Sequence, residues 1–327
     1  MRFAIYGAGA IGAYLGAKLA AAGEDVSLIA RGPHLRALQE HGVRVRSPDG
    51  DFEAKPLATD DPREVGEVDY LVLAVKAHGL TAIAPLLAPL LGDATAVVPA
   101  QNGIPWWYFS RHGGPWEGTR LESADPGGVI AAHISPERII GCVVYPAVAI
   151  VEPGVIEHTE GDRFSIGELD GSTSERCRAL STAIGRAGLR APIRSNIREE
   201  IWVKLLGNSA FNPVSALTRA SLAEIAADPD ARALVQAMME EIYGVAAELG
   251  IDIPVSIEAR MAGAEAVGAH KTSMLQDVEA AKPLEVDGLV GTVLELGRML
   301  GRPMPCTSAV YACAKLLGAK AVEAAAG

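Results

Sequence analysis

A row of polar side chains follows one predicted helix near residue 200. Residues 196–213 carry apolar side chains at four-residue steps, which predicts a helix. Lys204, Asn208 and Asn212 repeat at the same spacing, so they lie one above the other on the helix surface. Pro213 disfavours helical geometry in the residue before it, so we expect the helix to end at Asn212. The row is either a solvated face, although such faces usually mix Glu with Lys, or a site that positions a ligand.

A glycine-rich loop near the N-terminus points to a nucleotide cofactor. Residues 2–6 read as a buried strand, residues 11–22 as a helix and residues 25–30 as a second strand. Between the first strand and the helix, the GxGxxG spacing is typical of a Rossmann-type dinucleotide site, where the helix N-terminus binds the pyrophosphate. The residues expected to bind the cofactor here are Gly7, Ala8, Gly9, Ala10, Ile11 and Gly12.

The residue after the second strand indicates which dinucleotide is used. NAD-preferring sites usually carry an acid at this point for the ribose hydroxyl, whereas an arginine accommodates a 2′-phosphate. Arg31 occupies the position, so the expected cofactor is NADP(H), unless Arg31 is only a surface arginine. Lys76 and Asn102 follow the next two buried strands, at 69–75 and 95–100, where a cofactor would run in a parallel sheet.

The chain changes character near residue 195. Short strands with turns fill residues 138–168, whereas only helices are predicted after Asn196. The expected fold class is therefore α/β, with an N-terminal Rossmann-type dinucleotide-binding domain (1–195) and a second, all-helical substrate and dimerisation domain (196–327). We expect the site between these domains, a common position for ligands.

Three further features bear on the site. Ser273 heads a Ser-x-x-Gln pattern, which predicts a capping box, and a helix start also favours a carboxylate. Glu285 is a candidate partner for Lys204 or for the cofactor ribose. Residues 106–109 are all aromatic in a chain with only 5% aromatic residues, and they form either a packed loop, a subunit contact or an apolar wall beside a substrate.

Composition narrows the functional class. The 327 residues carry a formal net charge of -11, which argues against a nucleic-acid surface. The four cysteines show no metal-binding spacing, and reduced, buried thiols are expected. No signal peptide and no membrane-spanning apolar run is seen, so a cytoplasmic protein without a membrane or metal partner is expected.

Taken in order, the motifs resemble the ketopantoate reductase (2-dehydropantoate 2-reductase) family over nearly the whole chain. The resemblance rests on Gly7-Ala-Gly-Ala-Ile-Gly12, Ala74-Val-Lys76, Gln101-Asn-Gly103, Pro153-Gly-Val-Ile-Glu-His158, Ile201-Trp-Val-Lys-Leu-Leu-Gly-Asn208, Asn212-Pro213, Ser273-Met-Leu-Gln-Asp277 and Glu285-Val-Asp-Gly288.

The resemblance implies a role for each matched residue. Lys204 would be the proton donor, with Glu285 as the second catalytic candidate. The substrate-binding residues would be Asn102, Asn208, Asn212 and Ser273. The residues bordering the cofactor would be Lys76, Asn102, Ala147 and Glu285.

The family reduces ketopantoate to pantoate with NADPH on the way to coenzyme A, which makes this the first reaction to expect, with a homodimer as the assembly. Two departures keep an alternative open: Leu222 stands where some members carry another asparagine, and the connection 105–136 is long. A relative acting on a bulkier or aromatic 2-keto acid, with Trp106 and Trp107 beside it, is the same-chemistry alternative. A non-catalytic NADP-sensing module is the alternative from another class.

Overall fold

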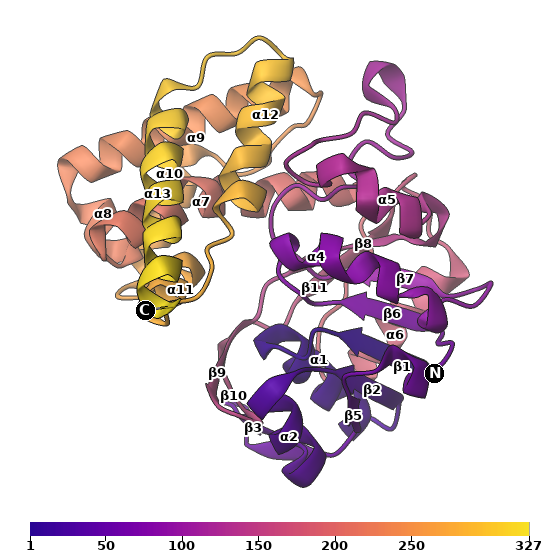
Figure 1. Cartoon of the computed structure of the whole chain (residues 1–327). Helices are drawn as coiled ribbons and strands as arrows, with labels where there is room; N and C mark the ends of the chain where they lie inside the picture. Colours follow the sequence, from indigo (N-terminus) through magenta and orange to yellow (C-terminus); the bar gives the residue numbers. More distant parts are fainter. Residues whose placement is uncertain (327) are drawn as a thin grey trace. The chain divides into compact units, whose positions relative to one another are not determined.

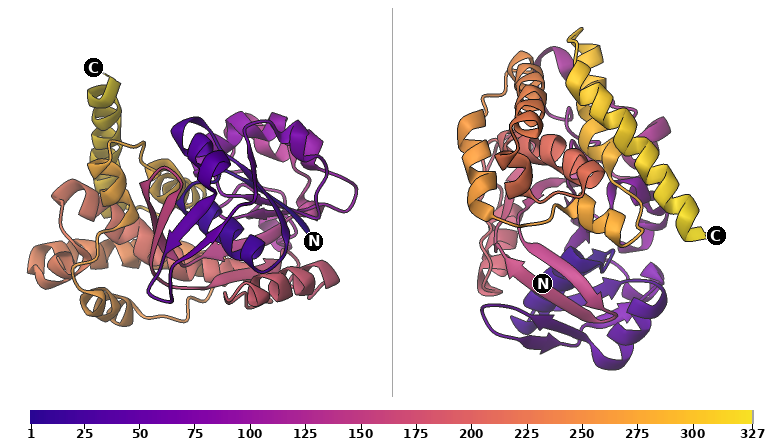
Figure 2. Two further views of the ribbon diagram at one scale, coloured as in Figure 1. Left: turned by 90° about the horizontal axis from the view of Figure 1, so that it is seen from below. Right: turned by 90° about the vertical axis from the view of Figure 1, so that its left-hand side faces the viewer.

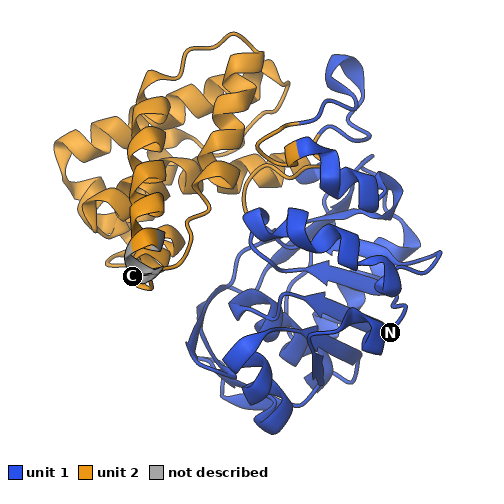
Figure 3. Ribbon diagram, in the orientation of Figure 1, with its two compact units in different colours: residues 1–101, 109–120, 127–197 blue, residues 102–108, 121–126, 198–327 orange. Residues whose placement is uncertain are grey.

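The chain forms two compact units. A computed structural model describes residues 1–326, without the side chains of 322 and 324–326 (Figure 1). Unit 1 contains residues 1–101, 109–120 and 127–197, and unit 2 contains residues 102–108, 121–126 and 198–327 (Figure 3). The expected division between residues 195 and 196 lies close to the last point at which the chain passes from unit 1 to unit 2, between Ile197 and Arg198. Two short segments of unit 2 come from the chain before this point. That division stays a prediction as a boundary between functional domains.

Unit 1 is built on a five-stranded parallel sheet with the order β5–β2–β1–β6–β7. Its strands are β1 (Arg2–Tyr6), β2 (Asp25–Ile29), β5 (Leu57–Thr59), β6 (Tyr70–Leu73) and β7 (Ala96–Pro99). Their side chains are buried along nearly their whole length, as expected for a parallel sheet covered on both faces. The winding reverses between β1 and β6, and open sheets of this kind bind ligands beyond the carboxyl ends of the strands at such a point.

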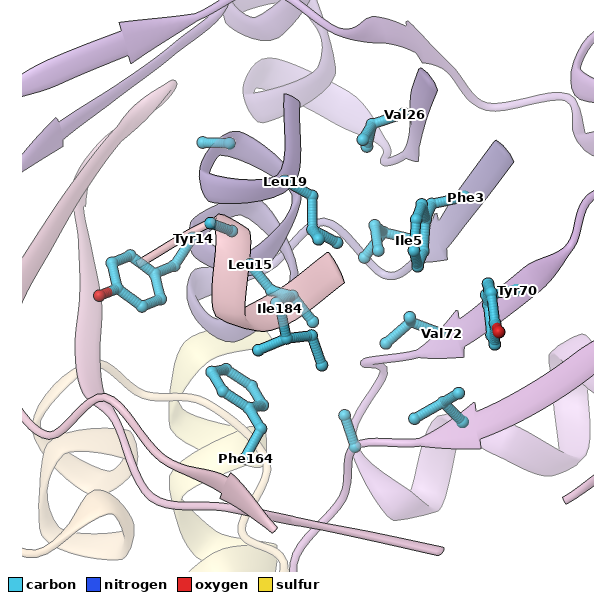
Figure 4. Packing of buried hydrophobic residues seen from close by; sticks show 14 of the residues in the cluster. Phe3, Ile5, Tyr14, Leu15, Leu19, Val26, Tyr70, Val72, Phe164 and Ile184 are labelled. Atoms are coloured by element: carbon cyan, nitrogen blue, oxygen red, sulfur yellow. The ribbon is translucent and has the colours of Figure 1, made fainter. Parts of the chain in front are cut away.

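Helices pack against this sheet through a continuous apolar core. The α-helices of unit 1 are α1 (Ala10–Ala21), α2 (Gly32–His41), α3 (Pro62–Val65), α4 (Ala77–Ile83), α5 (Val129–His133) and α6 (Glu175–Arg186). Leu15 and Leu19 of α1 share one buried cluster with Ile5 of β1 and Ile184 of α6 (Figure 4). The core thereby fixes α1, and with it the glycine loop at its start.

Two smaller sheets complete unit 1. One has the order β4–β3–β10–β9, and the other pairs β11 with β8. Their strands are β3 (Val43–Arg46), β4 (Phe52–Ala54), β8 (Ile140–Val144), β9 (Ala147–Glu152), β10 (Val155–Glu160) and β11 (Phe164–Glu168). Strands β9 and β10 pair antiparallel on either side of Gly154, whose φ is +79°, in agreement with the short strands and turns predicted for residues 138–168.

The described residues of unit 2 form helices and loops only, which confirms the predicted fold class. They comprise α7 (Ile197–Thr218), α8 (Leu222–Ala227), α9 (Pro229–Glu248), α10 (Ile257–Val267), α11 (Ser273–Glu279), the π-helical turn η6 (Asp287–Gly291), α12 (Thr292–Met299) and α13 (Pro305–Ala326). Ser221 and Glu224 form a capping box at the start of α8, and the Asp228 side chain caps α9. Figure 2 shows α13 as one long helix, in yellow.

The predicted end of the first helix at Asn212 is wrong. α7 continues to Thr218 with Pro213 inside it. An interior proline removes a backbone hydrogen bond and costs about 3 kcal/mol. Val214 and Ala216, which lie beyond it, are buried, so packing of this last part of the helix offsets the cost.

Candidate functional site

Only glycine fits at Gly7, in the turn after β1, and at Gly12, in the first turn of α1. Gly7 has a φ of +94°, and a Cβ on it would lie 2.7 Å from the backbone nitrogen of Val75. A Cβ on Gly12 would lie 2.3 Å from the Gly7 carbonyl oxygen. The loop is therefore pressed against the chain that follows β6, as expected for close helix–strand packing in a dinucleotide fold.

Gly9 has a different environment, which suits a ligand. A Cβ placed there would meet only the Gly7 carbonyl oxygen, at 4.0 Å. Gly9 is also the N-cap of α1, and within the described chain no side chain caps this helix and no acid lies in its first turn. The first N–H groups of a helix have no carbonyl partner within it, and the helix dipole adds positive potential. The loop therefore fits the pyrophosphate of a dinucleotide.

Arg31 lies at the carboxyl end of β2, beside this loop. Tyr6, at the end of β1, pairs with Ile29 of β2. Burial raises the pKa of the Tyr6 phenol, and the nearby charge of Arg31 opposes that rise. The Arg31 side chain is exposed and forms no ion pair with any carboxylate among residues 1–326. Its charge is thus available to an anion, as a role at a 2′-phosphate requires.

Lys76 and Ala147 also lie in unit 1. Lys76 is the N-cap of α4, just beyond β6. The ends of β6 and β1 are adjacent, because the Ala74 N–H donates to the Tyr6 carbonyl at 2.9 Å. Lys76 is therefore at the same sheet edge as the glycine loop. Ala147 begins β9, and its carbonyl accepts from Thr159 Oγ1 at 3.2 Å. Contact of these two residues with a cofactor stays a prediction.

Sequence reasoning missed His34, which lies in the first turn of α2. Its Nδ1 accepts the Gly154 N–H at 3.1 Å, so the ring joins α2 to the β9–β10 turn. Burial lowers the pKa of His34, while the backbone of Ala8, in the glycine loop, acts in the opposite direction. The imidazole thus lies between the hairpin turn and the cofactor loop. The sequence signal was its place three residues after Arg31, at the start of a helix.

Unit 2 contains the predicted substrate residues. Lys204 and Asn208 are partly buried on α7, and Asn212 is 5% exposed. Asn212 Nδ2 donates to Ser273 Oγ at 3.4 Å, so the structure brings together two residues that lie 61 positions apart. An amide and a hydroxyl side by side can hold a carboxylate or hydroxyl oxygen.

The predicted capping role of Ser273 is wrong. The N-cap of α11 is Thr272, whose hydroxyl accepts from the Leu275 N–H at 3.2 Å. Ser273 is the first residue of the helix. Because Thr272 caps the helix, the Ser273 hydroxyl is directed to Asn212 instead.

Asn102 and Glu285 both approach η6 in unit 2. Gly103, which follows Asn102, has a φ of +93°, and its Cβ would lie 2.2 Å from the Gly288 carbonyl oxygen. The Glu285 carbonyl accepts the Leu289 N–H at 3.0 Å. Glu285 therefore lies about one turn before Gly288, the residue that Gly103 contacts. π-helical turns often occur at functional sites. Contact of Asn102 and Glu285 with a substrate or a cofactor stays a prediction.

The aromatic segment is a packed loop. Trp106, Trp107 and Tyr108 are 8%, 1% and 0% exposed, so their rings cannot line a substrate surface in this conformation. Trp202 Nε1 donates to Tyr108 Oη at 2.7 Å, and the two rings meet edge to face. The interpretation of Trp106 and Trp107 as a wall for an aromatic substrate therefore loses its structural basis.

Other kinds of site find little support in the described part of the chain. No three His, Cys, Asp or Glu side chains there are grouped so as to hold a metal ion. Each helix in that part is too short or too polar to cross a membrane. None of the four cysteines, all of which lie in the described part of the chain, forms a disulfide. Cys142 and Cys177 are buried, whereas Cys306 is half-buried and Cys313 exposed.

Comparison with known proteins identifies the family. The family model described as ketopantoate reductase PanE/ApbA matches residues 3–106, and its C-terminal counterpart matches residues 196–318. The chain belongs to the ketopantoate reductase family. A 2-dehydropantoate 2-reductase of Mesorhizobium japonicum is 52% identical over 319 residues, covering 97% of this chain and 98% of the relative.

Solved structures agree with this membership. A protein of Ralstonia solanacearum assigned to the ketopantoate reductases superposes with a TM-score of 0.93 at 43% identity, covering 98% of each chain. D-mandelate dehydrogenase with NADH gives a TM-score of 0.82 at 22% identity, covering 98% of this chain and 99% of the other, and shares the fold. Ketopantoate reductases are NADP-dependent oxidoreductases, which confirms the predicted enzyme class and cofactor.

Proposed function

We propose that this ketopantoate reductase family member reduces 2-dehydropantoate to pantoate with NADPH. The observation that carries the proposal is the 52% identity, over 97% of the chain, to a 2-dehydropantoate 2-reductase. The site is compatible with it: unit 1 offers an uncapped helix N-terminus for a pyrophosphate, and unit 2 offers amide and hydroxyl groups for a 2-keto acid. A sensing module would need neither Lys204 nor the Asn212–Ser273 pair.

The proposed chemistry assigns a task to each group. The bound cofactor supplies a hydride for the carbonyl carbon. Lys204, as an ammonium, donates a proton to the carbonyl oxygen, which leaves a 2-hydroxy acid and a neutral amine. Asn102, Asn208, Asn212 and Ser273 orient the substrate. Glu285 is the carboxylate partner of Lys204 or of the cofactor ribose.

In the same proposal, unit 1 binds the cofactor and unit 2 the substrate. The glycine loop holds the pyrophosphate and Arg31 the 2′-phosphate, while Lys76 and Ala147 border the rest of the cofactor. A cytoplasmic homodimer is proposed with it. Sedimentation velocity checks the dimer, which a single species of monomer mass at micromolar concentration would exclude.

A substrate panel tests the proposed reaction. NADPH oxidation is followed with 2-dehydropantoate, with smaller 2-keto acids and with aryl 2-keto acids such as benzoylformate. We expect the highest kcat/KM with 2-dehydropantoate. Faster turnover of an aryl 2-keto acid would replace the substrate and keep the reaction class, and no turnover of any 2-keto acid would overturn both.

A further inference from the structure

The segment that carries Asn102 is fixed to unit 2 at its beginning. It follows β7 of unit 1, yet Asn102–Tyr108 belongs to unit 2. The Gly103 backbone lies directly on η6, because a Cβ there would be 2.2 Å from the Gly288 carbonyl oxygen. Thr292 Oγ1 also donates to that carbonyl at 2.9 Å, so the surface under Gly103 is itself held in place.

The end of the segment is fixed by Tyr108. Its ring is 0% exposed, and its hydroxyl accepts from Trp202 Nε1 at 2.7 Å. Its backbone carbonyl accepts from Arg198 Nε at 2.8 Å, and the same guanidinium lies 5.8 Å from the ring centroid. Both partners belong to α7. Two buried hydrogen bonds therefore join Tyr108 to this helix.

The two anchors are connected through the candidate catalytic helix. Ser209 Oγ on α7 donates to the Leu289 carbonyl of η6 at 2.7 Å. These contacts form a closed loop: α7 contacts η6, η6 contacts Gly103, and the segment from Gly103 leads to Tyr108, which binds α7 again. On α7 this loop of contacts includes Trp202, two residues before Lys204, and Ser209, directly after Asn208.

We propose that Tyr108 is a positioning residue, which holds Asn102 in register with Lys204 and Asn208 as part of the substrate-binding unit. The inference rests on the proposed reaction, because it gives Asn102 a place at the substrate. It also gives the aromatic segment a task other than substrate contact. Asn102 would then reach the substrate together with Lys204, and unit 1 would contribute the cofactor.

The variant Tyr108→Phe tests the link. It leaves the buried Trp202 Nε1 without its acceptor while keeping the ring, so the segment is expected to shift rather than to collapse. We expect kcat for 2-dehydropantoate to fall by about 10- to 100-fold, since small displacements of positioning groups have such effects. KM for NADPH should change much less than kcat, because the groups proposed for the cofactor phosphates, the glycine loop and Arg31, lie in unit 1 and are not joined to Tyr108.

Tyr70→Phe is the matched control. Tyr70 is also a buried tyrosine with a hydroxyl bond, in this case to the Arg176 carbonyl at 2.8 Å, and it lies on β6 of unit 1. Burial raises the pKa of both phenols to about 12. Loss of a buried hydroxyl alone would lower kcat equally in both variants, which would contradict the proposal.

A double variant tests the bond between Tyr108 and Trp202. In a Trp202→Phe background, Tyr108→Phe should lower kcat much less than it does in the unchanged protein.

A readout that needs no turnover separates the two proposals. Hydrogen–deuterium exchange at the amides of residues 102–104 should be faster in Tyr108→Phe than in the unchanged protein or in Tyr70→Phe. Unchanged exchange there, or an unchanged kcat with 2-dehydropantoate, would overturn the role of Tyr108. Inactivity of the unchanged protein with every 2-keto acid would overturn the proposed function instead. In that case, faster exchange at residues 102–104 in Tyr108→Phe would still support the positioning role of Tyr108.

Discussion

At the scale of single residues, Lys204 carries the proton transfer in the proposed reaction. Replacing it with alanine removes the donor, so kcat should fall by about 10²- to 10⁴-fold, the usual contribution of a general acid. Steady-state NADPH oxidation measures this. Lys271→Ala is the control, because Lys271 is an exposed lysine of the same unit that pairs with Glu279 at 2.8 Å. A Lys204→Ala enzyme with a near-normal kcat would remove Lys204 from its role.

Arg31 should determine the choice between the two nicotinamide cofactors. Its exposed guanidinium has no carboxylate partner among the described residues, and NADPH differs from NADH by the 2′-phosphate. Arg31→Ala should therefore raise KM for NADPH about tenfold or more and change KM for NADH little. Arg36→Ala, which alters another exposed arginine of the same helix region, should change neither. Equal effects of Arg31→Ala on both cofactors would contradict the phosphate assignment.

Residue patterns predicted the glycine loop and the row on α7 because both depend on spacing within one element. Tyr108 and His34 could not be assigned in this way. The partner of Tyr108 is 94 residues away and that of His34 is 120 residues away. Only the folded chain brings such pairs together, so a single sequence shows the side chain but not its contact.

At the scale of elements, the glycine loop and the start of α1 contain glycines with two different roles. Gly9 leaves room for a ligand, whereas Gly12 allows close packing of the protein backbone. A Cβ at Gly9 meets only one protein atom within 4.0 Å, whereas at Gly12 it would lie 2.3 Å from the Gly7 carbonyl oxygen. Gly9→Ala should therefore keep the Tm but raise KM for NADPH, because the methyl occupies the place of a phosphate. Gly12→Ala should lower the Tm by several degrees, roughly the effect of 1–3 kcal/mol. A large loss of Tm in Gly9→Ala with unchanged KM would contradict this division.

Helices and strands with a strong apolar pattern could be predicted from the sequence. Short strands, and a helix end that depends on tertiary packing, could not. Four strands of the parallel sheet, β1, β2, β6 and β7, were expected from their apolar runs, and so was the helical character of the chain after residue 196. Strands β3, β4 and β5 have only 3–4 residues each, and β3 alternates Val with Arg in too short a run to stand out. The predicted helix end at Pro213 was wrong because burial of the helix beyond Pro213 outweighs the local backbone preference of proline.

At the scale of the whole molecule, the path of the chain between the units was invisible in the sequence. Residues 121–126 join unit 2, where Glu295 of α12 accepts the N–H groups of Glu122 and Ser123 at 2.7 and 2.8 Å. A contact between a carboxylate and backbone N–H groups more than 170 positions away leaves no local pattern in the sequence. The long connection after Asn102 is thus explained as two anchored segments rather than as an irregular insertion.

The stability of the whole chain should depend on pH through His34. Burial lowers its pKa below the ordinary value of 6.5, so the unfolded chain binds a proton first as the pH falls. The free energy of unfolding should therefore be highest above about pH 6.5 and decrease as the pH falls toward the lower pKa of the folded state. Urea unfolding at about pH 7.5 and pH 5.5 measures the difference.

His34→Gln isolates this contribution, because glutamine can still accept from the Gly154 N–H but does not titrate. We expect a smaller loss of stability between the two pH values in His34→Gln than in the unchanged protein. His78→Gln, at an exposed histidine, is the control and should keep the full loss. An identical pH dependence in all three proteins would show that His34 makes no such contribution.

Hydride transfer to a 2-keto acid is the centre of the account, and deuterium labelling measures it directly. The protein is incubated with 2-dehydropantoate and NADPH deuterated at the transferable position of nicotinamide carbon 4, and the product is analysed by mass spectrometry and proton NMR. We expect pantoate with deuterium on carbon 2. Pantoate without the label, or no pantoate at all from an intact, folded protein, would contradict it.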